Sequence, residues 1–231
     1  ALPAALLEIG VDASIAIPKY RSISSDLDLK KILTGMTAPV GDRLLHFDVY
    51  QTKLNALTVY LIDYPEYYDR DGIYRSDNGD YLDNAERYIF FSRAVVELLP
   101  FYPVQPTLLH CNDWQTGLVP LYLNRFKNVN PEYREVKSLF TVHNLAYQGL
   151  FWRFDMHLTG LPWDYFTPEG IEFYGDLNLL KAGLLFSDGI NTVSPTYCQE
   201  IQTPEFGCGL DGVLRSLKPK LSGILNGAVG A

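Results

Sequence analysis

The sequence of 231 residues contains few cysteines and has no long hydrophobic run. Its three cysteines, Cys111, Cys198 and Cys208, form no Cys-x-x-Cys pair. A disulfide framework or a structural zinc site is therefore not expected, and a reducing compartment fits better. No apolar run approaches the roughly 20 residues that span a bilayer, so we expect no transmembrane helix and no membrane partner. No signal peptide is visible.

Basic residues are outnumbered, with 19 Lys and Arg against 27 Asp and Glu, which gives a net charge of −8. This balance argues against nucleic acid or an anionic membrane surface as a partner, because both are bound through basic patches. A small anionic substrate is not excluded, since backbone amides at a local site can hold it.

The common catalytic signatures are also missing. No GxSxG elbow, HExxH motif, Walker A loop or complete GxGxxG fingerprint is present. His110, Cys111 and Asp113 in "HCNDWQTG" lie too close together for a recognised zinc spacing. Cys111 has no base nearby in the sequence that would make it a nucleophile. We therefore expect no metal site, no cofactor and no reactive thiol.

Hydrophobic residues make up 47% of the chain, enough for a substantial core. From residue 106 onward, short apolar runs typical of buried strands alternate with helical patterns. The strands are expected at 106–111, 136–144, 190–194 and 220–227, and the helices at 114–126, 177–189, 195–203 and 210–217. This alternation predicts an α/β, Rossmann-like fold with a mainly parallel sheet and helices on both faces. No internal boundary is evident, so one domain over residues 1–231 is expected.

The first part of the chain is less regular. Residues 1–9 are typical of a helix that ends at Gly10, and 13–18 of a buried strand. Residues 21–42 are polar, charged and glycine-punctuated, which predicts an excursion from the fold. Further expected elements are an antiparallel pair at 44–51 and 56–63, a loop at 63–80 and a helix at 84–99.

Polar residues follow four of the predicted strands, where open α/β sheets bind ligands. They are His110 to Asp113, His143 with Asn144, Ser194, and Asn226. Asp113 precedes a helix, so its carboxylate can cap the helix, contact a ligand, or do both. His110 and Trp114 are more typical of packing. His143 precedes the polar turn "NLAYQG", which favours a ligand contact.

The glycine-rich stretch "FGCGLDG" (206–212) precedes a predicted helix. Its amides could face an anion or a hydroxyl-rich ligand, and a hinge explains the glycines equally well.

Several motifs together resemble one family. "HCNDWQTGLVPLYL", "FTVHNLAYQGLF", "LKAGLLFSDGINTVSPTY" and "PEFGCGLDGVL" occur in the order found in bacterial-type glycogen and starch synthases. "ALPAALLEIGVDASIAIPKY" and "YLIDYPEYYDRDGIY" also match, so the resemblance covers nearly the whole chain. It implies one half of a two-domain GT-B fold. The implied activity is transfer of glucose from ADP-glucose, or UDP-glucose, to the non-reducing end of an α-1,4-glucan, with retained configuration and no catalytic metal.

The resemblance also implies roles for individual residues. His143 of "VHN" is expected near the anomeric centre as the catalytic residue, orienting the glucosyl group and stabilising an oxocarbenium-like transition state. The substrate-binding residues it implies are Asp113, Tyr74 and Asn226, with Tyr81, Asp83 and Asn84 of "YLDN" as weaker candidates. Asn144, beside His143 at the same sheet edge, is a further candidate.

Two departures from the family pattern limit what these 231 residues are expected to do. The resemblance implies a first strand with a lysine-glycine-glycine loop and a C-terminal GT-B domain, and these 231 residues contain neither. We therefore expect the chain alone to be inactive and to need that partner domain.

Two other functions remain open: a non-catalytic glucan-binding or scaffolding module that uses the aromatic segment 145–176, and another GT-B transferase such as a sucrose-type synthase. A bacterial cytoplasm or a plastid stroma is the expected compartment.

Overall fold

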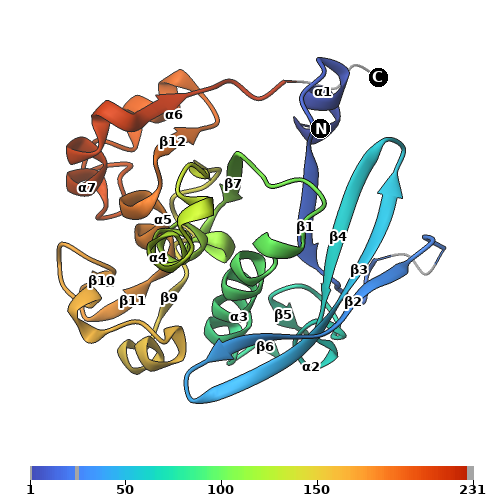
Figure 1. Cartoon of the computed structure of the whole chain (residues 1–231). Helices are drawn as coiled ribbons and strands as arrows, with labels where there is room; N and C mark the ends of the chain where they lie inside the picture. The colour runs from blue at the N-terminus through green and yellow to red at the C-terminus, as the bar shows by residue number, and fades with distance from the viewer. Residues whose placement is uncertain (1, 24–25, 228–231) are drawn as a thin grey trace. The chain divides into compact units, whose positions relative to one another are not determined.

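The computed structural model describes residues 2–23 and 26–227, and the chain forms two compact units (Figure 1). The first unit extends to Ala94 and the second begins at Val95. The division leaves no trace in the sequence because helix α3 (Asn84–Glu97) runs across it.

The first unit contains a four-stranded sheet in the order β1-β4-β3-β2. Its strands are β1 (Ser14–Pro18), β2 (Lys30–Val40), β3 (Arg43–Leu54) and β4 (Leu57–Asp63). β1 runs parallel to β4, whereas β3 is antiparallel to both β4 and β2. Leu57, Val59 and Leu61 alternate along β4 and share one buried face. The predicted strand at 13–18 and the antiparallel pair are therefore confirmed.

Helix α1 (Leu2–Glu8) precedes this sheet and ends as the sequence predicts. Gly10 adopts a left-handed φ of +82°, and its amide donates to the Leu7 carbonyl at 3.0 Å. Glycine accepts this conformation without a Cβ penalty, which is why it ends the helix.

The excursion predicted over 21–42 contains a strand that the sequence does not indicate: its second half forms β2, paired with β3 along a long antiparallel ribbon (Figure 1). The register shifts twice, between Lys31 and Leu33 and again between Leu33 and Met36. Gly35, with φ +68°, lies in the second irregularity, where its amide donates to Asp48 Oδ1 at 2.9 Å. Such bulges break the period-two alternation by which a strand is recognised in a sequence.

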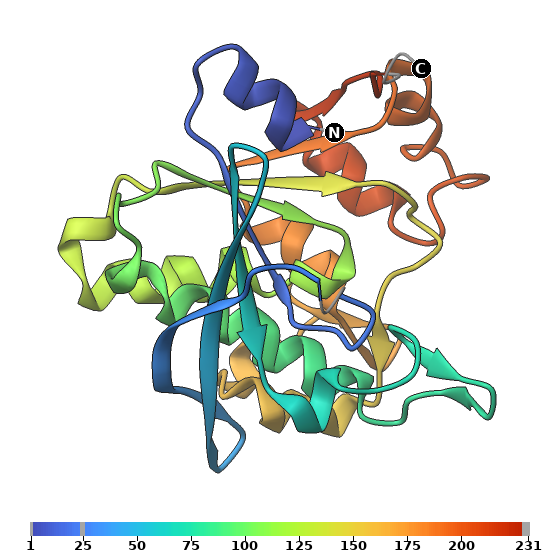
Figure 2. The same cartoon turned by 90° about the vertical axis from the view of Figure 1, so that its right-hand side faces the viewer.

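Residues 63–80 were expected as a loop, and the structure adds short elements to it. They are helix α2 (Pro65–Tyr68) and the hairpin of β5 (Arg75–Ser76) with β6 (Gly79–Asp80), seen in teal in Figure 2. Helix α3 follows, as predicted, and the Phe90 ring contacts Phe47 of β3 edge-on at 5.5 Å between centroids.

The second unit is built around an all-parallel sheet in the order β13-β12-β8-β7. Its strands are β7 (Leu108–Asn112), β8 (Lys137–Val142), β12 (Gly189–Thr192) and β13 (Leu221–Gly223). The α-helices between them are α4 (Val119–Val129), α5 (Leu179–Phe186), α6 (Pro195–Glu200) and α7 (Asp211–Ser216). A Cβ at Gly183 would overlap the Phe140 ring, so the glycine lets α5 pack closely on β8. The predicted α/β fold with a mainly parallel sheet is confirmed.

The remaining elements of the second unit are short. β9 (Leu150–Phe151), β10 (Glu172–Phe173) and β11 (Asp176–Asn178) form a small sheet in the order β10-β11-β9. The 3-10 turns are η1 (Leu99–Phe101), η2 (Trp114–Thr116), η3 (Pro131–Tyr133), η4 (Arg153–Thr159), η5 (Trp163–Tyr165) and η6 (Lys218–Lys220).

Within the described residues, no helix is both long and apolar enough to cross a bilayer.

Candidate active site

The carboxyl ends of the four parallel strands meet at one edge of the second unit, because parallel neighbours point the same way. Asp113 follows β7, His143 follows β8, Ser194 follows β12 and Asn226 lies beyond β13. The Asn226 amide donates to the Val193 carbonyl at 3.3 Å, which ties the segment after β13 to the end of β12. We call Asp113, His143, Asn144 and Asn226 the strand-end rim.

His143 is exposed on this rim and is held from two sides. Its backbone amide donates to Asp113 Oδ1 at 2.8 Å, and its ring Nε2 lies 3.1 Å from Asn112 Oδ1. An amide oxygen only accepts hydrogen bonds, so Nε2 carries the proton in this pair. In the neutral ring Nδ1 is then left as an acceptor.

Asp113 does not cap the helix that follows it. Its carboxylate makes no cap hydrogen bond in η2 and instead reaches across to the end of β8. Its backbone has φ +54° and ψ −175°, in a region that residues other than glycine rarely adopt. This strained turn is fixed by the Asp113 amide, which donates to the Thr141 carbonyl at 2.9 Å.

A second set of polar side chains lies within the same strands, before their carboxyl ends. The His110 ring Nε2 lies 2.6 Å from Thr141 Oγ1, and Thr141 in turn hydrogen-bonds Asn191. Burial, and next to it the neighbouring His143, lower the pKa of His110, so its ring is neutral near pH 7. Burial raises the pKa of Cys111 to about 12, which keeps it a thiol. These hydrogen bonds link β7, β8 and β12 next to the strand-end rim.

Trp114 packs as the sequence suggests. Its ring lies 5.6 Å from that of Phe151, and a Cβ at Gly149 would lie 2.6 Å from its ring. Gly149, with φ +63°, thus lets the loop after β8 approach the indole.

Asn144 is exposed beside His143 and shapes the following turn, since its Oδ1 accepts from the Ala146 amide at 3.0 Å. The glycine-rich 206–212 stretch is tied to the same unit. Gln148 Nε2 donates to the Cys208 carbonyl at 2.9 Å, and Asn178 Nδ2 donates to Gln148 Oε1 at 2.6 Å.

The other four candidates lie in the first unit, where protein contacts hold them. Asp83 forms a two-pronged ion pair with Arg70 at 2.8 and 2.7 Å. Tyr81 donates its hydroxyl to the Asp71 carbonyl at 2.5 Å, and Asn84 Nδ2 donates to the Tyr74 carbonyl at 2.9 Å. Tyr74 itself is 41% exposed. The structure thus brings these four together around one loop.

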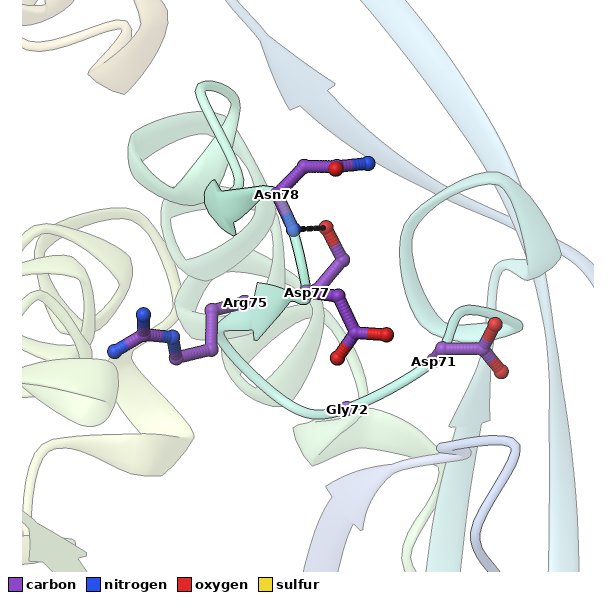
Figure 3. A pocket seen from close by; sticks show the side chains of 6 residues that line it. Asp71, Gly72, Arg75, Asp77 and Asn78 are labelled. Atoms are coloured by element: carbon purple, nitrogen blue, oxygen red, sulfur yellow. Dashed lines mark hydrogen bonds between the residues drawn. The ribbon is translucent and has the colours of Figure 1, made fainter.

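This loop also borders a hollow of about 550 Å³, lined by Asp71, Gly72, Arg75, Ser76, Asp77 and Asn78. In Figure 3 the labelled side chains of Arg75, Asp77 and Asn78 point in different directions. The one hydrogen bond drawn there runs from the Asn78 amide to Ser76 Oγ, at 3.2 Å. Binding sites have convergent polar groups, so we do not assign this hollow a ligand.

Among residues 2–23 and 26–227, no group of three or more His, Cys, Asp or Glu side chains could hold a metal ion.

Two functional residues are missed by sequence reasoning. Asn112, which the sequence places at the strand end but gives no role of its own, lies with Oδ1 3.1 Å from Nε2 of the His143 ring. Arg87 binds the loop that carries Tyr74, and an arginine within a helix gives no sequence signal of such a role.

An all-parallel α/β sheet with polar residues at its carboxyl edge is the arrangement of Rossmann-like ligand-binding proteins. The family model of the starch synthase catalytic domain matches residues 1–216, and the chain belongs to this family.

Relatives and a solved structure agree with this assignment. The chain is 42% identical to a glycogen synthase of Syntrophotalea carbinolica over 228 residues, covering 98% of this chain and 47% of that protein. It is 42% identical to a glycogen synthase of Moorella thermoacetica over 229 residues, covering 98% and 45%. The catalytic domain of starch synthase IV from Arabidopsis thaliana, bound to ADP and acarbose, matches with TM-score 0.87 and 31% identity, covering 98% of this chain and 46% of that one. The chain thus spans about half the length of the relatives it matches.

Proposed function

We propose that this chain is the acceptor-side half of a glucan synthase. The whole enzyme transfers glucose from ADP-glucose to the non-reducing end of an α-1,4-glucan, with retention of the anomeric configuration. The main support for this proposal is the strand-end rim, where His143 is exposed and hydrogen-bonded to Asp113 and Asn112. The Arabidopsis relative binds ADP and acarbose, which supports ADP-glucose over UDP-glucose as donor.

In this proposal, His143 acts by position and polarity. A retained glycosyl transfer passes through an oxocarbenium-like state, and a fixed imidazole beside the anomeric carbon orients the sugar and stabilises developing charge. Because both its backbone and ring are held, little reorganisation is needed on binding. Asp113 fixes the position of the His143 backbone by accepting its amide hydrogen bond. Asn144 and Asn226 form hydrogen bonds to sugar hydroxyls through their side-chain amides.

We propose that Tyr74 of the first unit is a substrate-binding residue. Tyr81, Asp83 and Asn84 have protein partners that hold this loop, so we assign them to support rather than to direct contact. The bacterial cytoplasm or the plastid stroma is the proposed compartment, with no nucleic-acid partner.

Transfer of labelled glucose from ADP-glucose to glycogen tests the proposal. The complete enzyme, in which this chain is joined to the second half present in its relatives, is expected to transfer glucose. The 231 residues alone are expected to give none, because the relatives are about twice as long. No transfer by the complete enzyme, with either ADP-glucose or UDP-glucose, would contradict the proposal.

One observation favours a second function, a non-catalytic glucan-binding module. Aromatic side chains of the 145–176 segment are exposed, Trp152 by 65% and Tyr174 by 85%. The Trp152 and Phe154 rings lie 4.7 Å apart between centroids, and flat exposed rings of this kind can stack on sugar faces.

Co-sedimentation with glycogen separates the two functions. A binding module would sediment with glycogen without turnover and would lose this property in the Trp152→Ala, Tyr174→Ala double variant. Turnover by the complete enzyme that persists in the double variant supports the synthase.

A further inference from the structure

Arg87 is a fully buried arginine on helix α3, and its guanidinium binds three separate segments of the first unit. Nε donates to the Tyr67 carbonyl at 2.9 Å. Nη1 donates to the Ile73 carbonyl at 2.9 Å and to Asn84 Oδ1 at 2.7 Å. Arg87 thus joins the end of α2, the loop after it and the first turn of α3.

Stability alone does not explain this arginine. Its partners are carbonyl and amide oxygens together with the faces of Tyr81 and Tyr88, 5.0 and 5.5 Å from the guanidinium carbon. Nη2 has no hydrogen-bond partner among the described residues. A buried charge without a carboxylate and an unsatisfied N–H are both costly, and an apolar side chain of similar volume would avoid them. The arrangement therefore indicates that Arg87 is needed to hold the backbone segments it contacts in a defined position.

The contacts of Arg87 and its neighbours fix the backbone on both sides of Tyr74. The Ile73 carbonyl accepts from Arg87 Nη1 and from the Tyr88 hydroxyl, the latter at 3.3 Å. The Tyr74 carbonyl accepts from Asn84 Nδ2 at 2.9 Å and from the Tyr81 amide at 3.0 Å. These carbonyls belong to the two peptide planes on either side of the Tyr74 Cα.

Fixing both planes fixes φ and ψ of Tyr74 and so the direction of its Cα–Cβ bond. Asn84 belongs to the same device, because its Oδ1 is held by Arg87 while its Nδ2 holds Tyr74. The half-exposed Tyr74 ring then rests 6.0 Å from the Tyr88 ring, between centroids.

We propose that Arg87 is a positioning residue that sets the orientation of Tyr74 through the Ile73 and Tyr74 carbonyls. The inference rests on the proposed function in one respect, which is that Tyr74 contacts the substrate. Arg87 touches no substrate and acts through the loop.

The first test measures the loop itself, without reference to activity. The Tyr81 amide is hydrogen-bonded to the Tyr74 carbonyl, so its hydrogen exchange reports whether the loop is held. We expect Arg87→Met to speed this exchange about tenfold more than that of amides in β4 of the same unit. Arg134→Met, at an exposed arginine of the second unit, is the matched control and is expected to change neither. Equal acceleration at Tyr81 and β4 would overturn the proposal.

Asn84→Ala provides a second route if Arg87→Met does not fold, because it removes the same link from its other end. It is expected to speed exchange at Tyr81 in the same selective way. Unchanged exchange in this variant would also contradict the proposal.

The second test is a double-mutant cycle in the complete enzyme, with Arg87→Met and Tyr74→Ala alone and together. If Arg87 acts through Tyr74, each single variant lowers kcat/KM for a maltooligosaccharide acceptor about tenfold, and the double variant matches Tyr74→Ala. Arg87→Lys is expected to recover part of the loss. Losses that multiply in the double variant would refute action through Tyr74. If Tyr74→Ala alone has no effect, the proposed role of Tyr74 fails, and the exchange measurement still decides whether Arg87 positions the loop.

Discussion

At Asp113, replacement by glycine is expected to destabilise the protein less than replacement by alanine. Both variants lose the carboxylate that accepts the His143 amide at 2.8 Å, which costs about 1.5–3 kcal/mol for a charged acceptor. Alanine keeps the strain of φ +54° and ψ −175°, about 1–3 kcal/mol, whereas glycine relieves it. Glycine also gives the unfolded chain more freedom, which offsets about 0.4–1 kcal/mol.

The glycine variant should therefore be more stable than the alanine variant by about 0.5–2 kcal/mol. Urea unfolding followed by tryptophan fluorescence measures this, because all three tryptophans, residues 114, 152 and 163, lie in the second unit. The matched control is Asp164, an exposed residue in the middle of η5, where alanine should be the more stable replacement. An alanine variant of Asp113 that equals or exceeds the glycine variant would refute the reasoning.

Two further predictions concern packing and pH. Gly117→Ala should lower the free energy of unfolding by about 1–3 kcal/mol, because the new Cβ would overlap the Leu179 carbonyl oxygen. Gly212→Ala on α7, whose Cβ would only make an ordinary contact with Arg215 Nη2 at 3.8 Å, should be neutral or slightly stabilising in the same urea assay. Equal effects of the two substitutions would contradict the packing argument. Burial raises the pKa of Tyr20 to about 12, so the folded state keeps a proton that the unfolded state releases above about pH 10. Stability is then present below pH 10 and is lost at about 1.4 kcal/mol per pH unit as the pH rises towards 12. Tyr20→Phe should flatten this loss when unfolding is followed by circular dichroism at pH 9 to 12, and an identical slope in the variant would show that Tyr20 is not responsible.

The parallel sheet of the second unit was predictable because its strands are short apolar runs. β8 and β12 are largely buried, and the helices between the strands supply a clear change of period. The same pattern places His143 and Asp113 at strand ends, so their neighbourhood follows from the topology. β2 was not predictable, since its bulges near Leu33 and Gly35 remove the alternation.

The details of the site depend on register and on backbone partners. Asp113 and His143 lie 30 residues apart along the chain. The pairing of β7 with β8 decides whether Asp113 caps its own helix or binds the His143 amide. The hold of Arg87 on Ile73 and Tyr67 uses carbonyl oxygens, which every residue possesses. Side-chain identities therefore carry no trace of it.

We propose that glucose is transferred at the strand-end rim around His143. The most direct test of this proposal is kcat for glucose transfer by the complete enzyme carrying His143→Ala, beside His157→Ala, an exposed histidine of η4 in the same unit. The account predicts a drop in kcat of about 10²–10³ for His143→Ala, with an unchanged urea midpoint, and near-normal turnover for His157→Ala. Equal kcat for the His143 variant and the unmodified enzyme would contradict it.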